Sequence, residues 1–134
     1  MQSIIETLQE RDDCTHFLRL VDIINFSEIL NGKGPFTVLV PNDQAFYDLP
    51  DDVFNDLVTK KGIITNILSN HVLVGEFTEN AIKNMDEIKT LDNNNIAVEL
   101  HNEGLIVGGA KIIEPNIECT NGMIHIIDVV LMPA

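Results

Sequence analysis

The side chains of this chain that could act as nucleophiles, bases or soft metal ligands are four histidines, three serines and two cysteines. The histidines occupy positions 16, 71, 101 and 125 and have none of the close spacings that zinc-binding pairs require. Ser69 lies two residues before His71, so both could share one face of a strand, but no acid in that segment would orient the histidine. We therefore predict no catalytic residue and no metal site, and a structural role for this pair.

Carboxylates are the chemical groups in excess, with 21 acidic residues against 8 basic ones and a formal net charge of -13. Such a surface repels phosphates and anionic lipid headgroups, so nucleic acid is not expected as a partner. No apolar run approaches the length of a membrane span, so direct membrane insertion is not expected either. A carboxylate pair for glycoside hydrolysis is defined by burial and separation, so an acidic hydrolase stays the less favoured alternative.

Cofactor-binding patterns are also missing from the sequence. Gly108-Gly109 lacks the residues that would have to follow it in a phosphate-binding loop. The run from Asp92 to Asn95 lacks the glycine and the distal glutamate of a calcium-binding loop. We therefore predict no cofactor.

Cys14 and Cys119 are the only cysteines, and the sequence leaves two states open for them. A disulfide would close a loop of about 100 residues and would stabilise the fold by roughly 4 kcal/mol. Free cysteines, however, are commonly small buried hydrophobic residues, and the dense disulfide framework of a small secreted domain is absent.

The elements that must position these groups are mainly helical in the first part of the chain. Ser3 and Glu6 have the spacing of a capping box, and residues 17–24 place apolar side chains at helical intervals. Acidic residues begin a further helix over residues 50–58, and residues 63–68 are expected to form one or two more helical turns.

Between these helices, short apolar runs predict buried strands. Residues 36–40 are apolar and β-rich and are followed by Pro41, which ends the strand. Asn42 is a suitable N-cap for a short helix that buries Phe46, and a second strand is expected at about residues 71–74.

The second half of the chain changes to the alternation that is typical of strands. Residues 96–100 and 105–107 predict a hairpin, and residues 111–114 predict a further strand. Asn121-Gly122 predicts a turn before a long terminal strand over residues 123–132. Helices first and sheet later, without strand–helix–strand alternation, predict the α+β class.

Three segments carry a more specific signal. Residues 34–46 read Gly-Pro-Phe-Thr-Val-Leu-Val-Pro-Asn-Asp-Gln-Ala-Phe, and residues 121–133 read Asn-Gly-Met-Ile-His-Ile-Ile-Asp-Val-Val-Leu-Met-Pro. They resemble the two signature blocks of the fasciclin (FAS1) domain, and residues 67–75 occupy the place of its tyrosine–histidine segment. Order and spacing match as well, so residues 1–134 are identified as a single FAS1 domain, similar to microbial members.

The resemblance implies an α+β fold in which a helical layer packs on a β-wedge or a sandwich of two small sheets. The residues of its signature blocks are of turn, cap and core types, so they are expected to be structural. They are Thr37, Pro41, Asn42, Asp43, Ala45, Phe46, Asn121, Gly122, His125 and Asp128. We expect Asn121-Gly122 to supply the positive φ of a tight turn, and His125 and Asp128 to lie on opposite faces of the terminal strand.

The resemblance also implies a non-enzymatic adhesion or binding module that contacts an extracellular protein or a polysaccharide at the cell surface. On this resemblance the domain is expected to be one unit of a larger exported protein, although no signal peptide is visible in the sequence. A structural spacer or a self-associating scaffold domain is the alternative function.

Two short elements that animal members use for integrin contact correspond here to Asn70-His71 and Asn116-Ile117, the candidate partner-binding residues. Asn70 replaces the tyrosine of the first element, and Asn116 replaces the aspartate of the second. Both departures argue against integrin binding. For His71, the residues favour a hydrogen-bonded core histidine over a contact residue.

Overall fold

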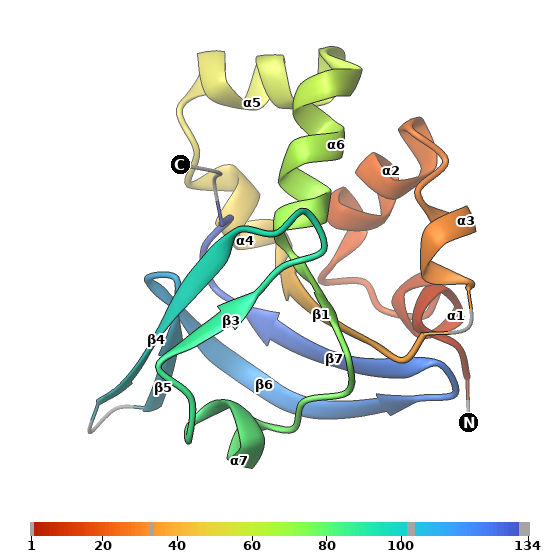
Figure 1. The fold of residues 1–134 in the computed structure, drawn as a ribbon. Helices are drawn as coiled ribbons and strands as arrows, with labels where there is room; N and C mark the ends of the chain where they lie inside the picture. The colour runs from red at the N-terminus through yellow and green to blue at the C-terminus, as the bar shows by residue number, and fades with distance from the viewer. Residues whose placement is uncertain (1, 33, 102–103, 132–134) are drawn as a thin grey trace.

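The computed structural model describes residues 2–32, 34–101 and 104–131, without the side chain of Val58. Its helices are α1 (Ile4–Gln9), α2 (Thr15–Ile23), α3 (Ser27–Leu30), α4 (Asp43–Tyr47), α5 (Asp51–Thr59), α6 (Lys61–Asn70) and α7 (Glu79–Ile82). Its strands are β1 (Phe36–Pro41), β2 (Val72–Val74), β3 (Glu87–Lys89), β4 (Asn95–His101), β5 (Gly104–Val107), β6 (Ala110–Cys119) and β7 (Gly122–Ile127). Helices α1 to α6 gather on one side of the strands, and α7 lies at the opposite side (Figure 1).

The strands form one curled sheet in the order β2-β1-β7-β6-β5-β4-β3. β1 and β7 run parallel along their whole length, from Phe36 beside Gly122 to Pro41 beside Ile127, and the other pairs are antiparallel. An isolated bridge between Leu73 and Thr90 brings the β2 edge back to the β3 end of the sheet. The α+β fold with a helical layer on a β-wedge is therefore confirmed, and the wedge is continuous through its seven strands.

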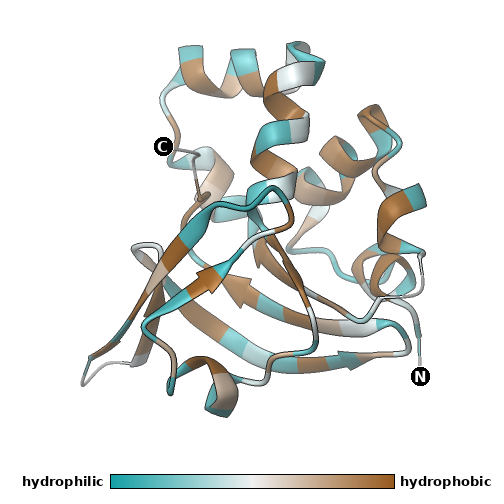
Figure 2. Ribbon diagram, viewed as in Figure 1, coloured by the Kyte–Doolittle hydropathy of each residue, from teal (hydrophilic) through white to brown (hydrophobic). Residues whose placement is uncertain are grey.

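Two apolar clusters occupy the two sides of the central strands. Val38 and Val40 of β1 point into the cluster beneath the helices, whereas Leu39 points into the cluster inside the wedge. On β7, Ile126 faces the helices and Ile127 faces the wedge. Because both faces of these strands are buried, they read as nearly continuous apolar runs, interrupted by Thr37 in β1 and His125 in β7 (Figure 2).

Short polar side chains set the helix starts in the helical layer. Ser3 and Glu6 form the predicted capping box, with Glu6 N–H donating to Ser3 Oγ at 3.2 Å and Ser3 N–H donating to Glu6 Oε1 at 3.0 Å. The predicted N-cap at Asn42 is also confirmed, since Asn42 Oδ1 accepts from the N–H of Ala45 at 2.9 Å. These caps depend on residues within four positions, which is why the sequence alone could indicate them.

Asp43 joins two helices that are distant in the sequence. Its two carboxylate oxygens accept from Thr15 Oγ1 at 2.7 Å and from the N–H of His16 at 2.9 Å. The side chain of Asp43, at the start of α4, therefore satisfies a free N–H in the first turn of α2. This contact fixes α4 against α2.

Several predicted elements agree with the structure. The buried strand over 36–40 is β1, the hairpin is β4 with β5, and the helices over 50–58 and 63–68 correspond to α5 and α6. Residues 102–103, at the hairpin turn, lie outside the described residues.

The predicted long terminal strand is wrong, because β7 ends at Ile127. Asp128 lies just beyond the strand, so the expectation that His125 and Asp128 occupy opposite faces of one strand is also wrong. The physical reason is that the N–H of Lys111 donates to Asp128 Oδ1 at 2.8 Å, so a side-chain oxygen takes the place of a backbone carbonyl, although the N–H of Asp128 still donates to the carbonyl of Lys111 at 3.2 Å.

The strand predicted over residues 111–114 extends over the whole of β6. Its pairing with β7 shifts register between Ile112 and Glu114 and again between Glu114 and Ile117. Such bulges interrupt the two-residue alternation of side chains, so the full length of this strand cannot be predicted from that alternation. The sequence also missed α7 and β3, which are only four and three residues long.

Both cysteines are free and buried in the structure. Burial raises the pKa of the Cys14 thiol to about 12 and raises that of Cys119 as well. Cys119 Sγ lies 3.5 Å from Thr7 Oγ1. Of the two states that the sequence left open, the structure has the buried, unreactive thiols.

Candidate functional site

His71 lies at the end of α6, and its side chain is 0% exposed. Nδ1–H donates to the carbonyl oxygen of Ile67 at 2.7 Å, and Nε2 accepts from the N–H of Leu131 at 2.9 Å. These partners assign a neutral imidazole with its proton on Nδ1. Burial lowers the pKa of His71 to about 4, although the hydrogen bond to Ile67 acts in the opposite direction. The structure thus places this candidate contact residue in the core.

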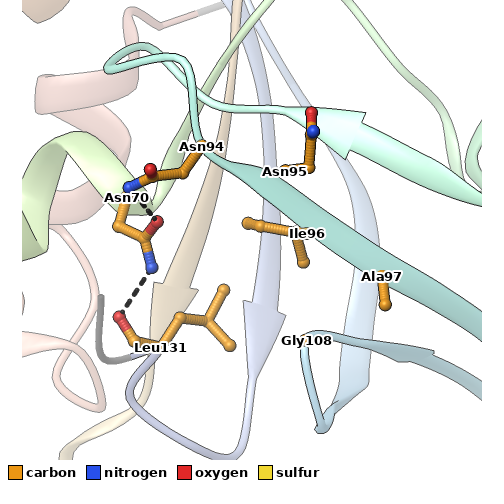
Figure 3. A pocket seen from close by; sticks show the side chains of 7 residues that line it. All are labelled: Asn70, Asn94, Asn95, Ile96, Ala97, Gly108 and Leu131. Atoms are coloured by element: carbon orange, nitrogen blue, oxygen red, sulfur yellow. Dashed lines mark hydrogen bonds between the residues drawn. The ribbon is translucent and has the colours of Figure 1, made fainter. Parts of the chain in front are cut away.

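Asn70 is almost as deeply buried, with 6% of its surface exposed. Its Nδ2 donates to the carbonyl oxygen of Leu131 at 3.0 Å, and its Oδ1 accepts from Asn94 Nδ2 at 3.5 Å (Figure 3). Asn70 and His71 therefore hold both backbone polar groups of Leu131, the carbonyl and the N–H. Two consecutive residues at the end of α6 fix the segment that follows β7.

A pocket of about 340 Å³ opens beside this contact, and we call it the amide pocket. Its lining comes from the end of α6, the start of β4, the turn before β6 and the segment after β7 (Figure 3). The lining residues are Asn70, Asn94, Asn95, Ile96, Ala97, Gly108 and Leu131. No charged residue is among these described lining residues. Amides both donate and accept, so the pocket suits a neutral polar group resting on apolar carbon atoms.

Asn116 and Ile117 occupy a different part of the fold. Asn116 lies in the bulged part of β6 with φ of 60°, a left-handed conformation that asparagine tolerates. Its Oδ1 accepts from the N–H of Glu79 at 2.9 Å and so holds the start of α7, while Ile117 is half-buried beside the helical cluster. The contacts among the described residues do not join this pair to Asn70 and His71.

His125 lies in the wedge and is also 0% exposed. Its Nε2–H donates to the carbonyl oxygen of Phe77 at 2.8 Å, and its Nδ1 accepts from the N–H of Asn116 at 3.0 Å. Burial lowers the pKa of His125, while the Phe77 hydrogen bond and the Glu79 charge act in the opposite direction. This signature histidine connects β7 to the bulge of β6 and to the segment before α7.

Other signature residues hold loops to the strands. Thr37 Oγ1 donates to the carbonyl of Gly75 at 2.7 Å and accepts from the N–H of Phe77 at 2.8 Å. Asn121 accepts from the N–H of Ile4 at 3.1 Å and donates to the carbonyl of Leu30. Pro41, Ala45 and Phe46 are buried.

Gly122 has the predicted positive φ, 158°, directly after the short turn that joins β6 to β7. A second requirement for glycine comes from the neighbouring strand. A Cβ at this position would lie 1.9 Å from the carbonyl oxygen of Phe36, because β1 and β7 approach each other closely there. The close approach of two strands therefore excludes any side chain.

Most of the amide pocket is not apparent from the sequence. Asn94 and Asn95 look like part of a polar loop, and Leu131 looks like part of a strand, because nothing in the sequence shows that they meet Asn70. The one available signal is the run of three asparagines at 93–95, which is unusually rich in side chains that both donate and accept.

A metal site and a general acid each set requirements that side chains in the described part of the chain would have to meet. There, no three histidine, cysteine, aspartate or glutamate side chains are arranged to hold a metal ion. Hydrogen bonds lower the pKa of the Glu6, Asp13 and Glu114 carboxyl groups, the latter two through Arg11. A general acid needs a raised pKa, so these three carboxyl groups are unsuited to that task.

Helices of the described ranges are too short or too polar to cross a membrane.

The arrangement of helices and strands defines the class of protein. It matches the structure of a FAS1 domain pair from the insect cell adhesion molecule Fasciclin I, with a TM-score of 0.86 and 21% identity. The match covers 98% of this chain and 51% of that one. The fold is therefore that of a FAS1 domain.

The family follows from the sequence comparison. The fasciclin domain model matches residues 12–133, and the chain belongs to the fasciclin family. It is 33% identical to protein sll1735 of Synechocystis, with 98% of each chain covered. It is 30% identical to human periostin over 99% of this chain, but spans only 16% of periostin. Immunogenic protein MPB70 of Mycobacterium bovis is 30% identical over 82% of this chain, which corresponds to 55% of MPB70.

Proposed function

We propose that this chain is a non-enzymatic binding module that contacts an extracellular partner at a cell surface. Family membership supports an adhesion-related role, and one structural relative is described as a cell adhesion molecule. The chain itself offers an open polar pocket, while its buried histidines serve the fold. The observation that carries the proposal is the amide pocket.

The chemistry of the amide pocket favours a neutral polysaccharide over an anionic one. Asn95 is exposed and its side chain has no hydrogen bond within the described residues. Asn94 donates at 3.5 Å to Asn70 and at 3.3 Å to Asp92, and both distances are long for a hydrogen bond. Sugar hydroxyls donate and accept, so they can exchange with these weak contacts.

Charge supports the same choice of ligand. The net charge of -13 repels carboxylated and sulfated polymers, whereas a neutral polymer experiences no such repulsion. Ile96 and Leu131 add apolar surface against which the carbon-bound hydrogens of a sugar ring can pack.

The test is binding of the purified chain to immobilised neutral and anionic polysaccharides and to a panel of extracellular matrix proteins. We expect binding to a neutral polysaccharide that weakens about tenfold or more when Asn94 and Asn95 are both changed to alanine, because each amide contributes one or more hydrogen bonds. Asn66→Ala, on the exposed face of α6, is the matched control and is expected to bind as the unaltered chain does.

Thermal unfolding of each variant separates loss of binding from loss of structure. Full binding by the double variant would contradict the role of the amide pocket. Failure to bind any polysaccharide or matrix protein would contradict the binding module itself.

A further inference from the structure

A second pocket, of about 330 Å³, lies between helices α2, α4 and α5, and we call it the aromatic pocket. Its lining residues are His16, Arg19, Phe46, Tyr47, Leu49, Asp51 and Phe54. None of these described residues lines the amide pocket. The two pockets therefore differ both in position and in chemistry, since rings rather than amides form the second one.

The rings surround His16 at steep angles. The centroid of its imidazole lies 5.1 Å from that of Tyr47 and 5.6 Å from that of Phe54, with interplanar angles of 89° and 86°. Phe46 lies 5.7 Å away at 51°. Edge-to-face rings of this kind pack favourably and form a concave wall rather than a flat stack.

The wall is held in place by the contacts of Asp43. Because Asp43 binds the N–H of His16, the α2 side of the pocket is tied to the start of α4, which carries Phe46 and Tyr47. Phe46 is buried and cannot rotate freely. The pocket is thus largely preformed, which reduces the entropy lost when a group enters it.

Part of this apolar wall is open to solvent. Tyr47 is 67% exposed, and Leu49 and Phe54 are half-buried. In addition, Nε2 of His16 is buried without a hydrogen-bond partner among the described residues. An exposed aromatic side chain at the mouth of an apolar pocket offers surface that a partner can bury.

Charge around the aromatic pocket selects the partner. Residues 43–59 include five aspartates and no lysine or arginine; Asp43 binds α2 and Asp56 pairs with Lys60, which leaves three for the pocket rim. Asp51 lies in the pocket lining, and Asp48 and Asp52 are exposed next to it in the sequence. Arg19 lines the same pocket, so a cation placed directly inside would be repelled. The pocket itself therefore favours an uncharged group, and its rim favours a basic one.

We propose that the aromatic pocket binds an apolar side chain carried by a lysine- or arginine-rich segment of a partner protein. The rings and Leu49 bury the apolar side chain, while the exposed Asp48, Asp51 and Asp52 attract the flanking basic residues. The inference goes beyond the proposed function, because it assigns a protein partner to a site separate from the amide pocket.

The sequence supplies its own probe for this test. Tyr47 is the only tyrosine and the chain has no tryptophan, so intrinsic fluorescence reports on the aromatic pocket alone. The purified chain is titrated with three short peptides. The first has one leucine flanked by lysines, the second has serine in place of that leucine, and the third has glutamates in place of the lysines.

We expect a saturable change in Tyr47 emission with the lysine–leucine peptide. The serine peptide should bind about tenfold or more weakly, because it lacks the apolar side chain. The glutamate peptide should bind more weakly still. A higher salt concentration should weaken binding of the lysine–leucine peptide, because salt screens its attraction to the aspartates.

Two variants keep the test independent of folding. Asp51→Asn changes an exposed residue and should weaken binding of the lysine–leucine peptide several-fold, while lowering thermal stability only slightly, because Asp52 remains in the first turn of α5. Asn95→Ala, in the amide pocket, should leave peptide binding unchanged, so failure of one site can be told from failure of the other.

Three results would overturn the inference. They are equal responses to the lysine and glutamate peptides, a response to a neutral oligosaccharide but not to the peptides, and an unchanged Tyr47 emission with every peptide at millimolar concentration.

Discussion

His71 and His125 are both fully buried and both make two hydrogen bonds, yet they carry their protons on opposite ring nitrogens. His71 donates from Nδ1 to a carbonyl of its own helix and accepts from the segment after β7. His125 donates from Nε2 to the segment before α7 and accepts from the bulge of β6. The backbone groups around each ring therefore decide its tautomer.

The surroundings of the two rings differ as well. His71 packs edge-on against Phe17, with centroids 6.0 Å apart, and its partners Ile67 and Leu131 are buried. His125 contacts the half-buried Phe77 and the exposed Asn116, and the charge of Glu79 is close enough to affect its pKa. His71, whose segment resembles an adhesive element, therefore has a more completely buried environment than His125, which belongs to a signature block.

The largest expected effect follows from truncating these rings. His71→Ala should lower the free energy of unfolding by roughly 4 kcal/mol, since it leaves a cavity and two buried backbone groups without partners. His125→Ala should lower it by roughly 2 kcal/mol, because water can reach Phe77 and Asn116 once the ring is gone. Urea unfolding followed by far-UV circular dichroism measures both. Equal losses, or a larger loss for His125→Ala, would contradict the difference between the two sites.

A second effect should appear on acidification. The folded-state pKa of His71 is about 4, below the ordinary value of 6.5, so below pH 6.5 the unfolded chain binds a proton that the folded chain does not. The stability contributed by neutral His71 is therefore complete above pH 6.5 and is lost as pH falls to about 4, by about 3 kcal/mol in total. The lowered pKa of His125 acts in the same direction.

The control for the pH effect is His71→Gln, which can keep an acceptor for Leu131 but does not titrate. Its free energy of unfolding should fall less steeply than that of the unaltered chain between pH 6.5 and 4. The carboxyl groups of Asp13 and Glu114, whose pKa values are lowered beside Arg11, lose their contribution at lower pH and in both proteins alike. Parallel curves for the two proteins would show that His71 is not the titrating group.

The sequence predicted those features that depend on neighbouring residues. The capping box at Ser3, the cap at Asn42 and the strand ended by Pro41 each involve a few consecutive positions. The FAS1 fold was predictable as well, because three separate segments resembled the family in the right order. The sequence favours a core position for His71, but its partner Leu131 lies 60 residues away, within the predicted terminal strand.

The candidate sites were harder to predict, since each is assembled from distant segments. The amide pocket joins Asn70 to Asn94 and Leu131, and the aromatic pocket joins His16 to Phe54. Side chains that meet only through tertiary packing leave no periodic pattern in the sequence. The position of Asn116 within β6 is likewise not apparent from the sequence, because the bulges interrupt the alternation of buried and exposed residues.

The smallest effect concerns Asn116, which connects the His125 site to α7. Its side chain accepts from the N–H of Glu79 in the first turn of α7, and its backbone is left-handed, so the two contributions can be separated by choice of substitution. Asn116→Gly keeps the conformation and removes only this hydrogen bond, for about 0.5 to 1 kcal/mol, whereas Asn116→Ala adds the strain of a left-handed alanine, for about 2 kcal/mol. Asn116→Asp can accept the same hydrogen bond and should stay within about 0.5 kcal/mol of the unaltered chain.

Urea unfolding of the three variants should therefore rank the stability of the alanine variant below that of the glycine variant, and the glycine variant below the aspartate variant. An aspartate variant as unstable as the alanine variant would contradict this explanation. The stability contributed by Asn116 would then not come from a hydrogen bond to Glu79 that any short side-chain acceptor can accept.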